Sequence, residues 1–228
     1  MRSNFYVLSF MAVITIILGF LLSFSSASLK ARQDYNIDID MKKNILKSLN
    51  IPADQSQKLS QSDIQKLYDD EITSLNIDEN GLLSENGVLS VYIAKDGDQP
   101  TGYSIPISGK GLWSTIYGYL ALEPDGNTIK GITFYQHGET PGLGGELEKD
   151  WFTANYVGKK IYNSDGMLVS VEIVKGQVNQ SGVNAIHQVD GISGATLTGK
   201  GLNNFIAQDL NIYKPFLDRI RVGENILE

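Results

Sequence analysis

Cysteine is absent from this 228-residue sequence, which excludes disulfides, thiolate-held iron–sulfur clusters and thiol catalysis together. The absence fits an oxidising compartment and a reducing one equally well. Histidine occurs only twice, as His137 and His187, and neither lies in an HExxH or other metal-spaced pattern, so we expect no metal site. Basic clusters are also missing, and the formal net charge is −7, which argues against a nucleic-acid partner.

Charge is missing altogether between Phe5 and Phe24. Twenty helical residues span roughly 30 Å, the thickness of a bilayer's hydrocarbon core. A cleaved signal peptide is the alternative, because small residues follow at positions 25–27, but its apolar region usually has only about 7–15 residues. We therefore expect a membrane anchor over residues 1–28, with a transmembrane helix at about 5–24. Arg2 and the amino terminus precede this run, and Lys30 and Arg32 follow it, so the positive-inside rule does not give the orientation.

The remaining chain predicts an α+β fold, with a largely antiparallel sheet flanked by helices. Residues 29–85 are expected to form a helical connecting region, in which Pro52 separates two amphipathic segments and Ser62 caps the second, DIQKLYDDEITSL. Residues 86–228 are expected to form the working domain. Its β-branched and aromatic runs predict strands at 88–94, 102–107, 112–122, 129–135, 159–163 and 168–174, with a turn at 123–127 and helices at 146–156 and 202–210.

The stretch GATLTGK, which begins at Gly194, has the G-x-x-x-x-G-K spacing of a nucleotide-binding loop. Such a loop needs Ser or Thr next to hold Mg²⁺, and Gly201 stands there, so a triphosphate site is not expected. The segment does feed the N-terminus of a helix, which favours a phosphate, and Ser193, Thr196 and Thr198 supply hydroxyls. An ordinary turn followed by a helix cap is the alternative. A serine hydrolase is disfavoured, because GISGA lacks the second glycine of G-x-S-x-G.

DGISGATLT, residues 190–198, resembles the D-x-x-[ST]-G-A-T flavinylation signature of covalent FMN-binding proteins. Further segments extend the resemblance, namely 109–122, 126–148, VGKKIY, IVKG, PFLDRIR and the single N-terminal span. Together they are similar to the family formed by the C subunits of the Na⁺-translocating NADH:quinone oxidoreductases. The resemblance covers most of the chain, although residues 50–85 carry little of it. The G subunit of Rnf-type electron-transport complexes is a related alternative.

The resemblance implies that a separate flavin transferase esterifies Thr196 to the phosphate of FMN. It also places Glu139, Thr140 and Leu143 near the flavin. The glycines of HGETPGLGG allow the backbone to approach a cofactor closely, although a plain Gly/Pro connection is the alternative. The full set of predicted FMN-binding residues is Thr196, Ser193, Gly194, Ala195, Leu197, Thr198, Glu139, Thr140, Gly142, Leu143, Gly144, Lys175, Trp113 and Asp190.

Three of these residues keep two interpretations each. Lys175 either balances the charge of the phosphate or reduced flavin, or is a solvated residue at a strand end. Trp113 packs either on the flavin ring or in the core. Asp190 serves either the transferase reaction or the turn. No residue is assigned to catalysis or to a metal.

The resemblance implies a subunit that relays electrons through FMN, working with the other membrane and peripheral subunits of the complex. It implies quinone as the final acceptor, Na⁺ transport by the whole complex, and a soluble domain on the periplasmic side of a bacterial inner membrane. Two other functions stay open: the flavoprotein of an Rnf-type complex, and a membrane-anchored sensor or binding module that uses the FMN domain without electron transport.

Overall fold

The computed structural model describes residues 4–52, 59–97 and 99–224, and it divides into a short N-terminal unit, residues 1–41, and a larger unit, residues 42–228. Helix α1 runs from Asn4 to Ser48, and its last turns belong to the larger unit. Within the described ranges, α1 is the one helix long and apolar enough to span a membrane, and none of its apolar window is buried. An exposed apolar run of this length is suited to lipid.

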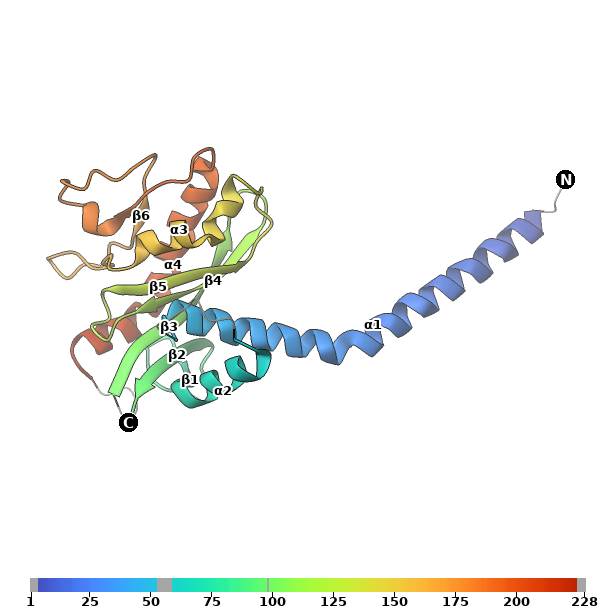
Figure 1. The fold of residues 1–228 in the computed structure, drawn as a ribbon, viewed down its shortest axis with the longest axis horizontal. Coiled ribbons are helices and arrows are strands. Elements are labelled where there is room, and N and C mark those ends of the chain that lie inside the picture. The colour runs from blue at the N-terminus through green and yellow to red at the C-terminus, as the bar shows by residue number, and fades with distance from the viewer. Residues whose placement is uncertain (1–3, 53–58, 98, 225–228) are drawn as a thin grey trace. The chain divides into compact units, whose positions relative to one another are not determined.

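The larger unit is built on a five-stranded antiparallel sheet, in which each strand pairs with the next in sequence (Figure 1). The strands are β1 (Ile72–Ile77), β2 (Leu89–Asp96), β3 (Gln99–Lys110), β4 (Thr115–Leu122) and β5 (Ile129–Gln136). The turn at 123–127 joins β4 to β5 as predicted, with Asp125 accepting the backbone N–H groups of Asn127 and Thr128. The predicted α+β fold with an antiparallel sheet is confirmed.

One face of the sheet packs against the C-terminal helix α4 (Thr196–Arg221) to form the core. Alternate residues of the strands point to this face, among them Val91, Ile105 and Leu120, since strand side chains alternate with a period of two. They meet a stripe on α4 that recurs every three or four residues, namely Leu202, Phe205, Ile206, Leu210, Tyr213, Phe216, Leu217 and Ile220. This packing fixes α4 across the sheet.

The opposite face is covered near the end of α1. Ser48 Oγ lies 2.9 Å from Ser104 Oγ, and both side chains are buried. A Cβ added at Gly131 would lie 2.4 Å from the Ser48 carbonyl oxygen, so this strand position requires glycine. The sequence does not predict this contact, because residues 48 and 131 lie far apart in the chain and each belongs to a different predicted element.

Helix α2 (Gln61–Glu71) begins earlier than predicted. Ser60, rather than Ser62, is the N-cap, and it forms a capping box with Asp63. The predicted helical ITSL is wrong: β1 begins at Ile72 and pairs with β2. The β-branched residues Ile72 and Thr73 pack better on a sheet than in a helix, and pairing with a neighbour decides between the two.

The segment between β5 and α4 has short elements: η1 (Gly144–Glu148), α3 (Asp150–Thr153), η2 (Ala154–Tyr156), β6 (Glu172–Ile173), η3 (Ala185–His187) and β7 (Gln188–Val189). The strands predicted at 159–163 and 168–174 are largely wrong. Only β6 and two isolated bridges form there, and β6 pairs in parallel with β7. The backbone instead bonds across loops, as Ser170 N–H does to Ile161 O. These elements and α4 enclose the site described next.

Candidate functional site

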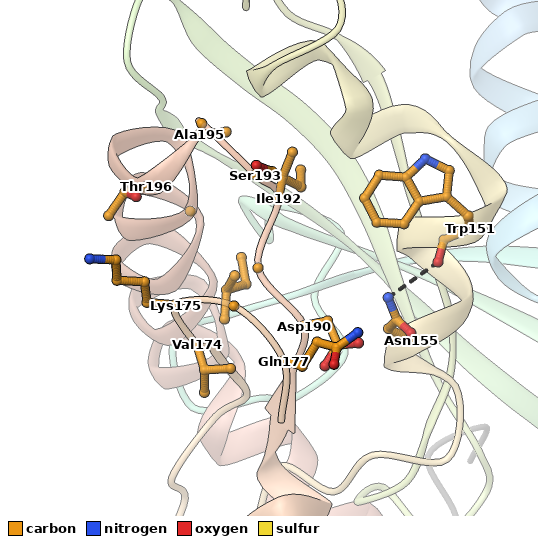
Figure 2. A pocket seen from close by; sticks show the side chains of 15 residues that line it. Trp151, Asn155, Val174, Lys175, Gln177, Asp190, Ile192, Ser193, Ala195 and Thr196 are labelled. Carbon is orange, nitrogen blue, oxygen red and sulfur yellow. Dashed lines mark hydrogen bonds between the residues drawn. The ribbon is translucent and has the colours of Figure 1, made fainter. Parts of the chain in front are cut away.

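A cavity of about 800 Å³ opens beside the start of α4 (Figure 2). Three segments line it: the α3–η2 region through Trp151 and Asn155, residues 173–177 from the end of β6 onward, and residues 190–196 with Gly199. This size lies within the usual range of about 300–1,000 Å³ for small-molecule sites. The lining combines apolar side chains, backbone and hydroxyl groups, which suits an amphipathic cofactor.

Helix α4 begins at Thr196, at the edge of this cavity, without a capping side chain. The turn before it needs Gly194, whose φ of +74° is a left-handed conformation that other residues rarely adopt. The first N–H groups of a helix have no intrahelical acceptor and carry the positive end of the dipole. The cavity therefore contains a helix N-terminus of the kind that binds phosphate.

The hydroxyls of Thr196 and Thr198 have different environments. Thr196 is exposed and lines the cavity. Thr198 is 1% exposed, and its Oγ1 donates a 2.6 Å hydrogen bond to Glu139 Oε2. The Thr198 hydroxyl is thus occupied inside the protein, whereas that of Thr196 is accessible to a reagent or an enzyme.

Glu139 joins three segments at this point. Besides the Thr198 hydroxyl, its Oε1 accepts the backbone N–H of Trp113 at 2.9 Å and that of Ser114 at 3.4 Å. Burial by itself raises a carboxyl pKa, but these hydrogen bonds outweigh it, so the pKa of Glu139 lies below its ordinary value. Glu139 is therefore a buried carboxylate that ties the β5–η1 loop to the β3–β4 hairpin and to α4.

Gly144 is required beside this contact. A Cβ at Gly144 would lie 2.6 Å from Thr198 Oγ1 and 2.8 Å from Glu139 Oε2. At this point the glycine-rich loop HGETPGLGG packs against other protein groups. The missing side chain of Gly144 leaves room for the hydrogen bond between Glu139 and Thr198.

The structure brings together about half of the predicted residues. Those that line the cavity are Lys175, Asp190, Ser193, Gly194, Ala195 and Thr196. Leu143 borders it, because its Cδ2 would lie 2.7 Å from a Cβ at Gly194. The predicted residues that do not line it are Glu139, Thr140, Gly142, Gly144, Leu197, Thr198 and Trp113.

Asp190 has a structural role, which favours the interpretation that it serves the turn. Its Oδ1 accepts the backbone N–H of Val178 at 2.7 Å, and the next residue, Gly191, donates its N–H to Gly176 O at 2.7 Å. These bonds hold residues 176–178 against the turn before α4. Asp190 thereby shapes two walls of the cavity.

Lys175 and Trp151 lie on opposite sides of the cavity in Figure 2, with Lys175 on the same side as Thr196. Sequence reasoning missed Trp151, which is 51% exposed, and Asn155 beside it. Trp151 Nε1 donates to Glu146 Oε2 at 3.3 Å, and Asn155 Nδ2 donates to the Trp151 carbonyl. An aromatic residue on the polar face of the predicted 146–156 helix was the available signal. Trp113 is 70% exposed, so it is not a core tryptophan.

Gly201, which stands where a triphosphate-binding loop needs Ser or Thr, is explained by helix–sheet packing. A Cβ at Gly201 would lie 2.5 Å from the Lys110 carbonyl oxygen, so this turn of α4 touches the end of β3. A similar contact occurs at Gly109, whose added Cβ would lie 2.1 Å from that of Phe205. The glycines on both sides of this contact therefore reflect close helix–sheet packing.

Comparisons with known proteins agree with this geometry. Residues 111–211, which include the whole cavity lining, match the FMN-binding domain family. The chain is 46% identical over 137 residues to the C subunit of the Na⁺-translocating NADH-quinone reductase of Pseudomonas aeruginosa, covering 59% of this chain and 52% of that protein. It is 38% identical over 178 residues to the corresponding protein of Vibrio parahaemolyticus, covering 75% and 66%. The chain thus spans about half to two thirds of the length of the curated relatives it matches.

Solved structures extend the match. The crystal structure of the corresponding protein from Parabacteroides distasonis is 33% identical, with a TM-score of 0.72, and the match covers 83% of this chain and 96% of that chain. The Shewanella oneidensis NqrC structure is 25% identical, with a TM-score of 0.68, covering 80% and 98%. Sequence, fold and cavity agree, and the chain therefore belongs to the NqrC family, the C subunits of the Na⁺-translocating NADH-quinone reductases.

Proposed function

We propose that this chain is the electron-transfer subunit of a Na⁺-translocating NADH:quinone reductase, and that it carries FMN on Thr196 through a phosphoester bond. FMN supplies the redox chemistry when it is bound, and the protein supplies position and electrostatics. The names of the relatives and the FMN-binding domain match support the cofactor and the complex.

The choice of Thr196 rests on one observation: of the two threonines at the start of α4, only Thr196 is exposed and lines the cavity. Thr198 donates its hydroxyl to buried Glu139. Attachment replaces the hydroxyl proton of Thr196 by the flavin phosphoryl group. A phosphate monoester is a poor phosphoryl donor, so the flavin transferase must use a flavin phosphoanhydride. The phosphate that carries the flavin is transferred to Thr196, and the second phosphate of the anhydride is the leaving group.

Each part of the cavity then has a task. The uncapped N–H groups at the start of α4 hold the phosphate oxygens. Lys175 lines the same cavity and supplies a positive charge for the phosphate. Trp151 and Leu143 offer apolar surface to the isoalloxazine ring. The role of Glu139 is indirect: it holds together the loops that border the site, which also carry Thr140 and Trp113.

Placement in the membrane follows from α1. We infer that the apolar part of α1 is a retained anchor in a bacterial inner membrane and that residues 42–228 work on the periplasmic side. Between Phe5 and Phe24 this helix has no charged residue. An ion path across a membrane is usually marked by ionisable groups within it, so in this proposal the other subunits form the sodium path.

The test is co-expression of the full chain with a flavin transferase, followed by denaturation, in-gel flavin fluorescence and mass spectrometry. The wild-type protein should fluoresce and gain the mass of FMN less one water. Thr196→Ala should lose both signals. Ser181→Ala is the control, because Ser181 is an exposed hydroxyl outside the signature and outside the cavity lining, and it should keep both. Covalent flavin on Thr196→Ala, or none on the wild type, refutes the attachment.

A further inference from the structure

His137 is the first residue after β5, and its imidazole joins the two ends of the loop that borders the proposed flavin cavity. Where the loop begins, Nδ1 of His137 accepts the backbone N–H of Glu139 at 3.2 Å. Where the loop ends with η1, Nε2 lies 3.4 Å from Oε2 of Glu148. The side chain is only 11% exposed. We call these two contacts the His137 clasp, because one ring holds both ends of residues 138–148.

The loop reaches the cavity through its tip. The carbonyl oxygen of Thr140 accepts the N–H of Leu143 at 3.1 Å and that of Gly145 at 2.9 Å. This turn presents Leu143, whose Cδ2 would lie 2.7 Å from a Cβ at Gly194, in the turn before α4. Thr140 directly follows Glu139, so the position of Leu143 depends on how the loop is held where it begins.

The two contacts of His137 require one protonation state. A ring nitrogen that accepts an N–H has no hydrogen of its own, so the imidazole is neutral, with its hydrogen on Nε2 toward Glu148. Lys149 donates to Oε1 of Glu148 at 2.9 Å and holds the pKa of that carboxyl below its ordinary value, so Glu148 is a carboxylate. The charged groups that face the ring are therefore Glu148 with Lys149 behind it, and Glu139 in the loop. A second hydrogen, on Nδ1, would set two donors against each other and break the contact with the Glu139 N–H.

His187, the other histidine, provides a contrast within the same chain. Its Nδ1 lies 2.6 Å from the carbonyl oxygen of Lys160. A carbonyl oxygen can only accept, so here Nδ1 carries the hydrogen. In their neutral forms the two histidines should therefore be opposite tautomers.

We propose that His137 is a positioning residue for the flavin: its neutral Nε2–H tautomer clasps the loop that presents Leu143 to the cavity, and a proton on Nδ1 releases the start of that loop. This inference rests on the proposed flavin site. The clasp also fixes the backbone of Glu139, whose carboxylate accepts from the Trp113 N–H and the Thr198 hydroxyl. Release at His137 therefore loosens the contacts that Glu139 makes with the β3–β4 hairpin and with α4.

The first experiment is ¹⁵N NMR of the full chain in detergent, labelled only at histidine and made without a flavin transferase. The chain has two histidines, so two sets of ring signals are expected, and His137→Asn assigns them. At about pH 8 the hydrogen should be on Nε2 of His137 and on Nδ1 of His187. A hydrogen on Nδ1 of His137 at that pH would overturn the clasp. This measurement needs no substitution at the clasp, so it stands even where a variant does not fold.

Two variants separate the clasp from ordinary packing. His137→Asn keeps an acceptor for the N–H two residues on, as in an Asx-turn, and this acceptor does not titrate. His137→Leu occupies the site without an acceptor. Amide exchange at Glu139 should be about tenfold faster in His137→Leu than in His137→Asn, as expected for one lost hydrogen bond. The wild type should match His137→Asn at about pH 8 and approach His137→Leu at about pH 5, each comparison being made at one pH. Equal exchange in the two variants, or a wild type that follows His137→Asn at both pH values, would overturn the proposal.

The flavin-loaded chain tests the positioning itself. The emission and the midpoint potential of the flavin should shift in His137→Leu and return to the wild-type values in His137→Asn. Flavin signals that are the same in all three proteins, while amide exchange differs, would overturn the role toward the flavin. The NMR and exchange measurements use the chain without flavin, so a failure of attachment at Thr196 would be distinguished from a failure of the clasp.

Discussion

The contact between Glu139 and Thr198 should contribute more to stability than any other single polar contact at the proposed flavin site. Glu139→Ala leaves the Trp113 N–H and the Thr198 hydroxyl without their acceptor. A buried donor left unpaired costs about 1–3 kcal/mol, so we expect a loss of about 3–5 kcal/mol. Glu139→Gln keeps an acceptor for Trp113, and the Thr198 hydroxyl can accept from the new amide, so this variant should lose about 1 kcal/mol.

The measurement is urea unfolding of the full chain in detergent, followed by tryptophan fluorescence. Both tryptophans report on this region, because Trp113 donates to Glu139 and Trp151 lines the adjacent cavity. A double-mutant cycle with Thr198→Val should give a coupling energy of about 1.5–3 kcal/mol, typical of a hydrogen bond to a charged group. A loss below about 1 kcal/mol in Glu139→Ala, or equal losses in the Ala and Gln variants, would show that Glu139 does not hold these segments together.

The pH dependence of the same variants gives an independent check. The pKa of Glu139 is lower in the folded protein than its ordinary value, so folding favours the charged form. The stability from this charge is fully present above the unfolded pKa, about 4.3, and is lost as the pH falls through the folded pKa. The stability difference between the wild type and Glu139→Gln should therefore shrink in acid. A difference that stays constant to low pH would contradict the charged form.

Two further changes test the packing of α4. Burial raises the pKa of Asp209 to about 6, against the N–H that Ser108 donates to it, so stability should fall as pH rises from about 4 to 6. Asp209→Asn should therefore stabilise the protein at pH 7 by about 1–2 kcal/mol and lose this advantage at pH 4, as thermal unfolding at both pH values would show. Gly201→Ser completes the spelling of a triphosphate loop, yet its Cβ meets Lys110 O, so we expect about 1–3 kcal/mol of destabilisation and no ATP binding by calorimetry.

The sequence predicted the elements whose signals are local. The four strands from β2 to β5 follow from β-branched and aromatic runs between turn residues, and Asp125 formed the predicted turn. The strands predicted at 159–163 and 168–174 failed for the opposite reason. Their composition favours strands, but no long partner strand lies beside them among the described residues, and a strand forms only where a neighbour accepts its hydrogen bonds.

The cavity depends both on signals that are local in the sequence and on contacts between distant segments. The turn at Gly194 and the phosphate-binding helix start follow from glycines and hydroxyls that are adjacent in sequence. Trp151 and Lys175 reach the same cavity from segments that are far apart along the chain and joined by irregular loops. Spacing alone does not give such contacts. The resemblance supplied Lys175, whereas Trp151 lay outside every quoted motif.

The difference between the two threonines of DGISGATLT does follow from helix geometry once the first helical residue is known. Residues two positions apart on an α-helix are rotated by about 200°, so they face nearly opposite sides. Because α4 begins at Thr196, the next threonine turns toward the sheet and Glu139, and Thr196 stays at the surface. A helix that began later, as LNNFIAQDL alone suggests, would leave both threonines in a loop with no such distinction. The start of α4 therefore determines which hydroxyl is open to modification and which one holds the site together.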